Sequence, residues 1–132
     1  MQEQASERTP RTLRGARLSR HSDYQRVYQQ SRKYFSASMT YFFYRREDGL
    51  HSGPRIGLTA GRVLGKAVER NRIKRRMREA ARLNLEHLRA DVDVVLHPRR
   101  SVLEMDFSRL RDEVGEIFAK IEAAVKQKEK SA

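Results

Sequence analysis

Apolar residues recur along the chain in two rhythms, and each rhythm predicts a different kind of element. Some segments repeat apolar residues every three or four positions, as an amphipathic helix does, and others alternate or form a short apolar run, as strands do. The predicted helices cover about 22–31, 67–89 and 106–127, and the predicted strands cover about 34–44, 55–60 and 92–96. This order of helix, strand, strand, helix, strand, helix indicates an α/β sandwich.

Several element ends carry signals of their own. Ser22 followed by Asp23 predicts a helix start, because a Ser hydroxyl accepts first-turn N–H groups and a carboxylate suits the positive end of the helix dipole. Asp106 or Ser108 is the expected cap of the last helix for the same reason. Pro98 ends the third strand, whose valines predict burial on both faces.

Alternation divides the aromatic strand over 34–44 into two faces. This strand and the next are separated by a turn-rich stretch and are expected to pair antiparallel. The pattern leaves open which face of the aromatic strand lines a binding surface. One set is Met39, Tyr41 and Phe43, the opposite set is Thr40, Phe42 and Tyr44, and the first helix turns Tyr24, Val27 and Tyr28 to one side.

The composition points to a polyanionic partner. The 132 residues include 29 Lys and Arg against 17 Asp and Glu, a formal net charge of +12, with 38% apolar residues. RNA, DNA and an anionic membrane surface all fit such a charge. The chain has no cysteine, which excludes disulfides, thiolate zinc sites and a cysteine nucleophile. No stretch approaches the roughly 20 apolar residues of a membrane span, and no secretory signal is visible, so we expect a soluble cytoplasmic protein.

We expect one domain over 19–127, because a chain of this length is too short for two independent cores. Residues 1–18 carry arginine at three-residue intervals among polar residues and are predicted to form a flexible basic arm. Residues 128–132 are predicted to be a disordered tail.

The long helix has an apolar face and a polar face, which lie nearly opposite each other at about 100° per residue. Arginine forks about one helical turn apart can follow the phosphates of a nucleic-acid backbone, so the polar face is a candidate binding surface. The predicted buried arc contains Ile73, Met77, Ala80, Ala81 and Leu88, and the opposite arc of about 60° contains Asn71, Arg75, Arg78 and Arg82, with Lys74 at its border.

A solvated charged face is the alternative explanation of this basic run. From Arg62 to Arg82 there are nine basic residues and two acidic ones, Glu69 and Glu79. A helix that is merely soluble would interleave Glu at four-residue spacing, because like charges repel. The imbalance therefore favours binding to a polyanion.

The sequence offers little evidence of a catalytic site. The four histidines are scattered, and no serine lies in a nucleophile elbow. Asp91 and Asp93 could present two carboxylates to a metal, although such a pair more often forms ion pairs with nearby arginines. We therefore predict no metal site and no self-sufficient nuclease.

Three consecutive motifs link the second strand to the long helix: Arg55-Ile56-Gly57-Leu58-Thr59, Gly65-Lys66-Ala67-Val68, and Arg70-Asn71-Arg72-x-Lys74-Arg75-x-x-Arg78-Glu79. Together they resemble the signature of the bacterial ribonuclease P protein component. The match is specific over 55–82 and looser over 18–44 and 91–125. The resemblance implies a mixed sheet with a left-handed βαβ crossover, as in the second domain of ribosomal protein S5, against the general right-handed rule.

The resemblance further implies a catalytic RNA partner, one protein per RNA, which removes the 5′ leader of precursor tRNA with Mg²⁺. No protein side chain would then be catalytic. A cleft would hold the single-stranded leader, and a basic motif would face RNA. The cleft set is Tyr24, Tyr28, Tyr41, Phe43, Thr59, Arg62 and Lys66, and the basic set is Arg70, Asn71, Arg72, Lys74, Arg75, Arg78 and Arg82.

Two rival functions share some of these features. A ribosomal or ribosome-assembly RNA-binding protein would have the same charge and basic helix, but the aromatic first helix argues against it. A stand-alone metal-dependent endonuclease would use Asp91 and Asp93 and would cleave precursor tRNA without an RNA subunit. We expect RNA partners, with no DNA and no membrane.

Overall fold

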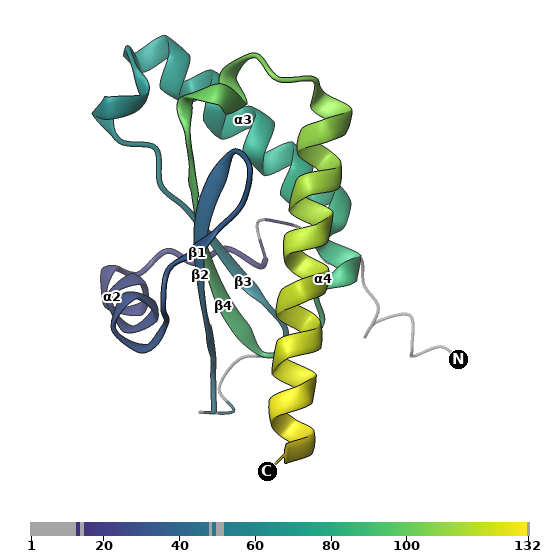
Figure 1. Ribbon diagram of the computed structural model, residues 1–132. Coiled ribbons are helices and arrows are strands. Elements are labelled where there is room, and N and C mark those ends of the chain that lie inside the picture. The colour runs from purple at the N-terminus through teal and green to yellow at the C-terminus, as the bar shows by residue number, and fades with distance from the viewer. Residues whose placement is uncertain (1–12, 14, 48, 50–51, 132) are drawn as a thin grey trace.

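The computed structural model describes residues 13, 15–47, 49 and 52–131, with side chains described up to 127 (Figure 1). The described strands form one mixed sheet in the order β1-β2-β4-β3, so the predicted sandwich is confirmed, with one strand more than expected. The elements are α2 (His21–Gln30), β1 (Tyr34–Phe35), β2 (Met39–Arg45), β3 (Arg55–Leu58), η1 (Arg62–Leu64), α3 (Ala67–Asn84), η2 (Leu85–His87), β4 (Val92–Pro98), η3 (Arg100–Leu103) and α4 (Phe107–Ser131).

Strand β4 lies inside the sheet, between β2 and β3. It pairs antiparallel with β2, where Tyr41 is opposite Leu96, and parallel with β3, where Ile56 is opposite Val94. The predicted antiparallel pairing of the first two long strands is therefore wrong, because β4 is inserted between them. Helix α3 connects the parallel neighbours β3 and β4, and the left-handed sense of this crossover stays a prediction.

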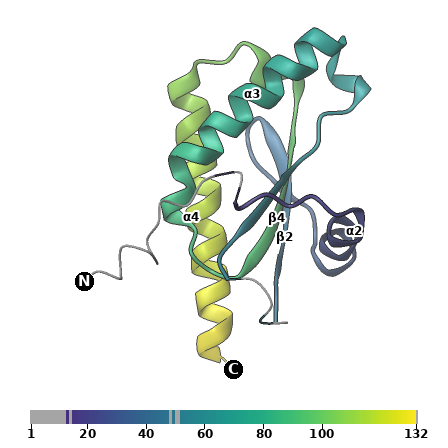
Figure 2. The same ribbon diagram turned by 180° about the vertical axis from the view of Figure 1, so that it is seen from behind.

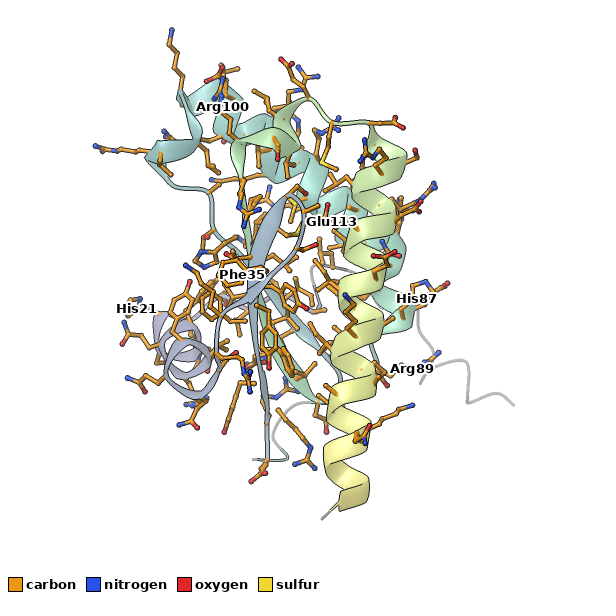
Figure 3. All side chains as sticks on the ribbon, in the orientation of Figure 1. His21, Phe35, His87, Arg89, Arg100 and Glu113 are labelled. Atoms are coloured by element: carbon orange, nitrogen blue, oxygen red, sulfur yellow. The ribbon has the colours of Figure 1, made fainter. Side chains whose placement is uncertain are left out.

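The predicted single strand over 34–44 is a short hairpin of β1 and β2. The chain turns at 36–38, where the Glu113 carboxylate accepts hydrogen bonds from the hydroxyls of Ser36 (2.6 Å) and Ser38 (2.6 Å) and from the Ser38 N–H (2.8 Å). Figure 3 shows Glu113 on the side of α4 that faces this hairpin. Alternation did not reveal the turn, because aromatic residues on both sides of it continue the strand pattern.

Helices cover both faces of the sheet (Figures 1 and 2). α3 and α4 pack on one face around the main core, and α2 packs on the other face over a smaller core of Leu18, Val27 and Val95. Each large apolar side chain that is fully buried contributes roughly 1.5–3 kcal/mol. The predicted buried arc of α3 is confirmed at Ile73, Met77, Ala80 and Ala81, which are no more than 2% exposed. Leu88 is also buried, but it lies after η2 and outside the helix.

The domain begins earlier than predicted. Residues 16–18 were expected in the arm, yet Ala16 and Leu18 are buried on either side of Ile56 in β3. The Ile56 N–H donates to the Ala16 carbonyl (2.6 Å), and the Leu18 N–H donates to the Ile56 carbonyl (2.9 Å). This segment covers the outer edge of β3, which would otherwise be open to pairing with another chain. Residues 1–12 and 14 of the predicted arm lie outside the described residues.

Helix α2 does not start as the capping signal predicts. It begins at His21, with Arg20 at the cap position and no side-chain cap bond, so Ser22 lies inside the first turn. Asp23 is instead buried beside Arg55, with which it forms an ion pair at 3.4 Å. Asp23 lies in the first turn, as expected of a carboxylate at the positive end of the helix dipole, and it also pairs with Arg26 of α2 at 3.2 Å.

The two longer helices also end differently from the prediction. α3 passes into the 3-10 turn η2 after Asn84, whose buried amide donates to the carbonyls of Ala80 (2.9 Å) and Arg111 (2.8 Å) and so ties α3 to α4. α4 starts directly after Asp106 and continues to Ser131, so 128–131 are helical where a disordered tail was expected. Within the described residues, no helix has the length and apolar character needed to cross a membrane.

Candidate nucleic-acid interface

Helix α3 presents polar residues on the side away from the sheet. Asn71, Arg72, Arg75 and Arg78 are exposed, whereas the apolar positions between them are buried. Within the described part of the chain, none of these four side chains has a hydrogen bond or ion pair. Their donors are open to a partner, and the mutual repulsion of three arginines favours an anion between them.

Other members of the basic motif are engaged within the protein. Arg70 donates to the Gly65 carbonyl (3.0 Å), and Arg82 is paired with Glu79 at 2.6 Å, which lowers the pKa of that carboxyl. Lys74 is half-buried at the border of the row. In the predicted row, Asn71, Arg75 and Arg78 are therefore available to a partner, whereas Arg82 is paired with Glu79.

Arg76, outside the predicted site, fixes the chain ahead of α4. Its guanidinium donates to the Val102 carbonyl (2.9 Å) and to the Met105 carbonyl, and its Cζ lies 5.9 Å from the centroid of the Phe107 ring, within reach of a cation–π contact. One basic residue of the run is thus structural, which its position near the buried arc of the helix explains.

A cluster of aromatic rings lies on the opposite face of the sheet, beside α2. Tyr28, Phe42 and His97 pack at tilted or edge-on angles, with centroid distances of 5.0 Å for Tyr28–Phe42, 5.6 Å for Tyr28–His97 and 5.3 Å for Phe42–His97. Tyr28 Oη and His97 Nε2 form a hydrogen bond of 2.8 Å. Burial raises the pKa of Tyr28, and burial followed by the charge of Lys33 lowers the pKa of His97. Both rings are therefore neutral at pH 7.

Tyr24 packs against β3 next to this cluster. Its hydroxyl oxygen accepts from the Leu58 N–H (3.2 Å), and its ring lies over Gly57. A Cβ at Gly57 would come within 2.7 Å of Cζ and Oη of Tyr24. Gly57 therefore leaves the space that the Tyr24 ring fills, and Tyr24 is half-buried where Tyr28 is 37% exposed.

The structure separates Tyr41 and Phe43 from the α2 cluster, which corrects the predicted cleft. Alternation along β2 points both rings to the α3–α4 face, where each stacks with Tyr34 at centroid distances of 5.3 Å and 5.1 Å. Tyr41 is 5% exposed there and belongs to the main core. Phe42, one residue away, faces α2 instead. Successive strand residues point to opposite faces, so the two sets cannot line one groove.

Phe42 and His97 are the candidates that sequence reasoning left out of the site. Phe42 belongs to the opposite alternation set, and alternation alone does not determine which set lines the binding surface. His97 looked isolated because Tyr28, its hydrogen-bond partner, is 69 residues away along the chain. Antiparallel pairing of β2 and β4 brings His97 opposite Thr40, within reach of Phe42.

The remaining predicted cleft residues follow β3 toward α3. Thr59 is half-buried, and its N–H donates to the Leu96 carbonyl (3.1 Å), which places it at the end of the sheet next to His97. Arg62 in η1 and Lys66, just before α3, are exposed. These three residues lie along the connection between the aromatic cluster and the start of the basic helix.

Asp93 lies at the centre of a buried ion network, in which two arginines occupy its carboxylate. Its Oδ1 accepts from Arg46 Nη1 (2.7 Å) and Arg55 Nε (2.8 Å), and its Oδ2 accepts from Arg55 Nη2 (2.8 Å). Asp91 accepts from the Gly53 N–H (2.6 Å). Among the residues that the structure describes, no group of three or more His, Cys, Asp or Glu is placed to hold a metal ion.

Comparison with known proteins places the chain in one family. A family model described as Ribonuclease P matches residues 13–122. The ribonuclease P protein component of Symbiobacterium thermophilum is 39% identical over 102 residues, which are 77% of this chain and 87% of that protein. That of Dictyoglomus thermophilum is 34% identical over 113 residues, 84% of this chain and 92% of that protein.

A solved structure shows the same fold. The ribonuclease P protein of Thermotoga maritima has a TM-score of 0.69 at 24% identity, over 80% of this chain and 97% of that one. This chain therefore belongs to the ribonuclease P protein component family, as a protein subunit that joins the ribonuclease P RNA in the endoribonuclease that processes tRNA 5′ ends.

Proposed function

We propose that the exposed row on α3 binds RNA phosphates and that the aromatic cluster beside α2 holds the single-stranded 5′ leader of precursor tRNA. The observation that carries this proposal is the separation of the two surfaces: unpaired Arg75 and Arg78 on one helix, and the Tyr28–Phe42–His97 cluster across the sheet. Arginine forks on a rigid helix suit a phosphate backbone, whereas aromatic rings suit unstacked bases. Each surface would then contact a different part of the substrate.

The connection after β3 would link the two surfaces. Arg62 and Lys66 are exposed cations between the aromatic cluster and α3, and Thr59 brings a hydroxyl to the end of the sheet beside His97. If the bases of the RNA leader stack on the aromatic cluster, its phosphates would run along Thr59, Arg62 and Lys66. Stacking on an aromatic side chain is worth about 1–3 kcal/mol per base and tolerates any sequence, as a leader of varying sequence requires.

Bond cleavage would belong to the RNA partner, with Mg²⁺ held by that RNA. Two features of the protein support this division. The Asp93 carboxylate is occupied by Arg46 and Arg55, and His97, whose pKa is lowered, is hydrogen-bonded to Tyr28. With a net charge of +12, the protein would reduce the repulsion between two RNA molecules. The resemblance to the family implies one protein per RNA.

The test is reconstitution with a bacterial ribonuclease P RNA at low Mg²⁺, scoring leader removal with and without the protein. We expect the protein to stimulate cleavage and to bind precursor tRNA more tightly than mature tRNA, with a steep loss of affinity as salt rises. Leader removal by the protein alone would contradict the assignment of catalysis to RNA. Equal affinity for precursor and mature tRNA would contradict the leader assignment.

Variants separate the two surfaces. Changing Arg75 and Arg78 together to Ala should weaken binding of both tRNA forms and reduce the salt slope by about two, because two phosphate contacts are lost. Tyr28→Ala should weaken binding of precursor tRNA only. Lys120→Ala is the matched control, since this exposed lysine lies on α4, away from both surfaces.

A further inference from the structure

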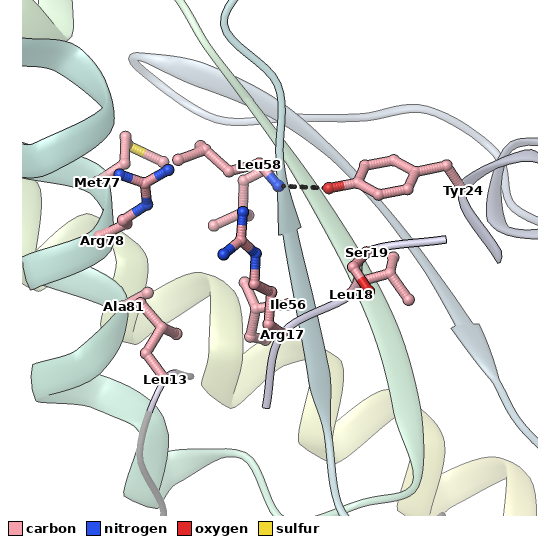
Figure 4. Close-up of a pocket in the computed structure, with 11 residues that line it drawn as sticks. Leu13, Arg17, Leu18, Ser19, Tyr24, Ile56, Leu58, Met77, Arg78 and Ala81 are labelled. Atoms are coloured by element: carbon pink, nitrogen blue, oxygen red, sulfur yellow. Dashed lines mark hydrogen bonds between the residues drawn. The ribbon is translucent and has the colours of Figure 1, made fainter. Parts of the chain in front are cut away.

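A cavity of about 510 Å³ opens at the outer edge of the sheet, between β3, α3 and the N-terminal segment. Figure 4 shows it as a gap bounded by Leu58 of β3, Ala81 and Arg78 of α3, and Arg17 of the segment that covers the strand edge. Its size is in the range of small-ligand sites, about 300–1,000 Å³. The Tyr28–Phe42–His97 cluster does not line it, whereas Tyr24 of α2 and Ser19 do (Figure 4).

The floor of the cavity is apolar. Several floor residues belong to the main core and are 6% exposed or less, so the surface they offer is rigid. An apolar floor of this kind accepts a planar ring, whose faces are poorly hydrated. The apolar lining residues are Leu13, Leu18, Ile56, Leu58, Met77, Ala81 and Leu96.

The rim of the cavity is cationic. Arg17 and Arg78 are both exposed, and in Figure 4 their guanidinium groups extend from opposite sides into the space between α3 and β3. Within the described residues, neither side chain has a hydrogen bond or ion pair. Two unpaired like charges at one opening repel each other, and an anion between them would relieve the repulsion. Guanidinium forks match the oxygens of a phosphate in particular.

We propose that this cavity is a nucleotide site, in which a planar base rests on the apolar floor and the phosphate lies between Arg17 and Arg78. The inference deepens the proposed RNA-binding function, since Arg78 also belongs to the α3 row. A free nucleoside monophosphate and a single unstacked nucleotide of an RNA strand share this chemistry. The site does not include Tyr28, Phe42 or His97 and shares only Tyr24 with the predicted leader cleft.

An NMR titration of the isotope-labelled full chain tests the site. The probes are adenosine 5′-monophosphate, ribose 5-phosphate and a five-nucleotide single-stranded RNA, followed at the amides of Leu18, Leu58 and Ala81. We expect saturable shifts with the monophosphate at about millimolar Kd, and at least tenfold weaker binding of ribose 5-phosphate, which lacks the base. Shifts of the same amides at lower RNA concentration would identify an RNA strand as the source, and their absence with RNA would identify the free nucleotide.

Two results would overturn the proposal. Equal affinity for ribose 5-phosphate and the monophosphate would show that the floor is not used. Shifts limited to Tyr28 and Phe42 would move nucleotide binding to the aromatic cluster. Tyr28→Ala should leave the monophosphate titration unchanged, so the leader assignment and the nucleotide site can fail independently.

Arg17 offers a specific variant, because it lies outside the α3 row. Arg17→Gln should weaken monophosphate binding about tenfold, since a hydrogen bond to a charged group is worth roughly 1.5–3 kcal/mol. Arg20→Gln is the matched control: Arg20 is an exposed arginine of the same segment and does not line the cavity. Both variants should unfold at the wild-type temperature. Equal titrations for the two variants would remove Arg17 from the site and refute the proposal.

Discussion

Arg55 and Asp93 meet through two hydrogen bonds, Nε to Oδ1 and Nη2 to Oδ2, each 2.8 Å long. They lie opposite each other on the parallel neighbours β3 and β4. The same guanidinium also reaches Asp23 of α2, with Nη1 3.4 Å from Oδ2. One arginine therefore ties α2, which carries Tyr24 and Tyr28, to the sheet.

Asp93→Asn should destabilise the fold strongly. The Asp93 side chain is 0% exposed and that of its partner Arg46 is 1% exposed, so the variant leaves buried guanidinium charge without its carboxylate. Removing one partner of a buried ion pair costs about 3–5 kcal/mol. Urea unfolding measures the loss. Asp112→Asn is the control, because the Arg111–Asp112 pair is 47% and 70% exposed and should contribute less than about 1 kcal/mol. Equal losses in the two variants would refute the role of burial.

Gly57→Ala should disturb the packing of α2 against β3, because Tyr24 of α2 lies over Gly57. The added Cβ would come within 2.7 Å of the Tyr24 ring, so the ring must move away from β3. Overpacking of this kind costs about 1–3 kcal/mol, and the preference for precursor over mature tRNA should fall with it. Thermal unfolding and the two RNA affinities are the measurements.

Gly61→Ala provides the comparison for this prediction. Gly61 has φ −81°, which any residue adopts, and no atom lies within 4 Å of the added Cβ. It should change neither stability nor RNA affinity. If Gly57→Ala behaved in the same way, the packing of Tyr24 over Gly57 would not be what holds α2 in place.

Local periodicity predicted the elements and the buried arc of α3, because both follow from the spacing of neighbouring residues. It did not predict which strands pair. β4 is inserted between β2 and β3 although it follows both in sequence, and no local pattern reports such a non-local arrangement. The turn at 36–38 was missed for a related reason, since Glu113, which holds it, lies on α4.

The candidate site likewise has one part that the local sequence predicts and one part that depends on how the strands pair. The exposed row at Asn71, Arg75 and Arg78 follows from helix geometry alone, and the structure places it as predicted. The aromatic surface could not be predicted without the sheet register, because Phe42 and His97 become neighbours only when β2 pairs with β4. Membership in the ribonuclease P family also replaces the alternative of a ribosomal protein, which charge alone allowed.

Glu69 predicts a pH dependence of stability. Hydrogen bonds first from Arg100 and then from the Lys66 N–H lower its pKa from 4.5 to about 2. Figure 3 shows Arg100 near the start of α3. Because the folded-state pKa is the lower one, this carboxylate stabilises the fold fully above pH 4.5, and its contribution is lost as the pH falls toward 2.

The difference in unfolding temperature between wild type and Glu69→Gln should therefore shrink as the pH falls from 4.5 toward 2. NMR titration of the Glu69 carboxyl gives the pKa directly. Arg100→Gln should raise that pKa toward its ordinary value, whereas Arg111→Gln, at an exposed pair elsewhere, should leave it unchanged. A constant temperature difference across this pH range would contradict the prediction.

Phe42 and Phe43 test which face of β2 holds the leader. Both are half-buried phenylalanines in one strand, but Phe42 packs beside Tyr28 on the α2 face and Phe43 stacks with Tyr34 on the core face. Phe42→Leu removes a stacking ring and should lower precursor affinity about fivefold while mature tRNA binds as before, since stacking contributes about 1–3 kcal/mol per base. Phe43→Leu should cost about 1 kcal/mol of stability and leave both affinities unchanged. Filter binding with the two RNAs and urea unfolding separate these outcomes, and a loss of precursor affinity in Phe43→Leu equal to that in Phe42→Leu would refute the assignment of the α2 face.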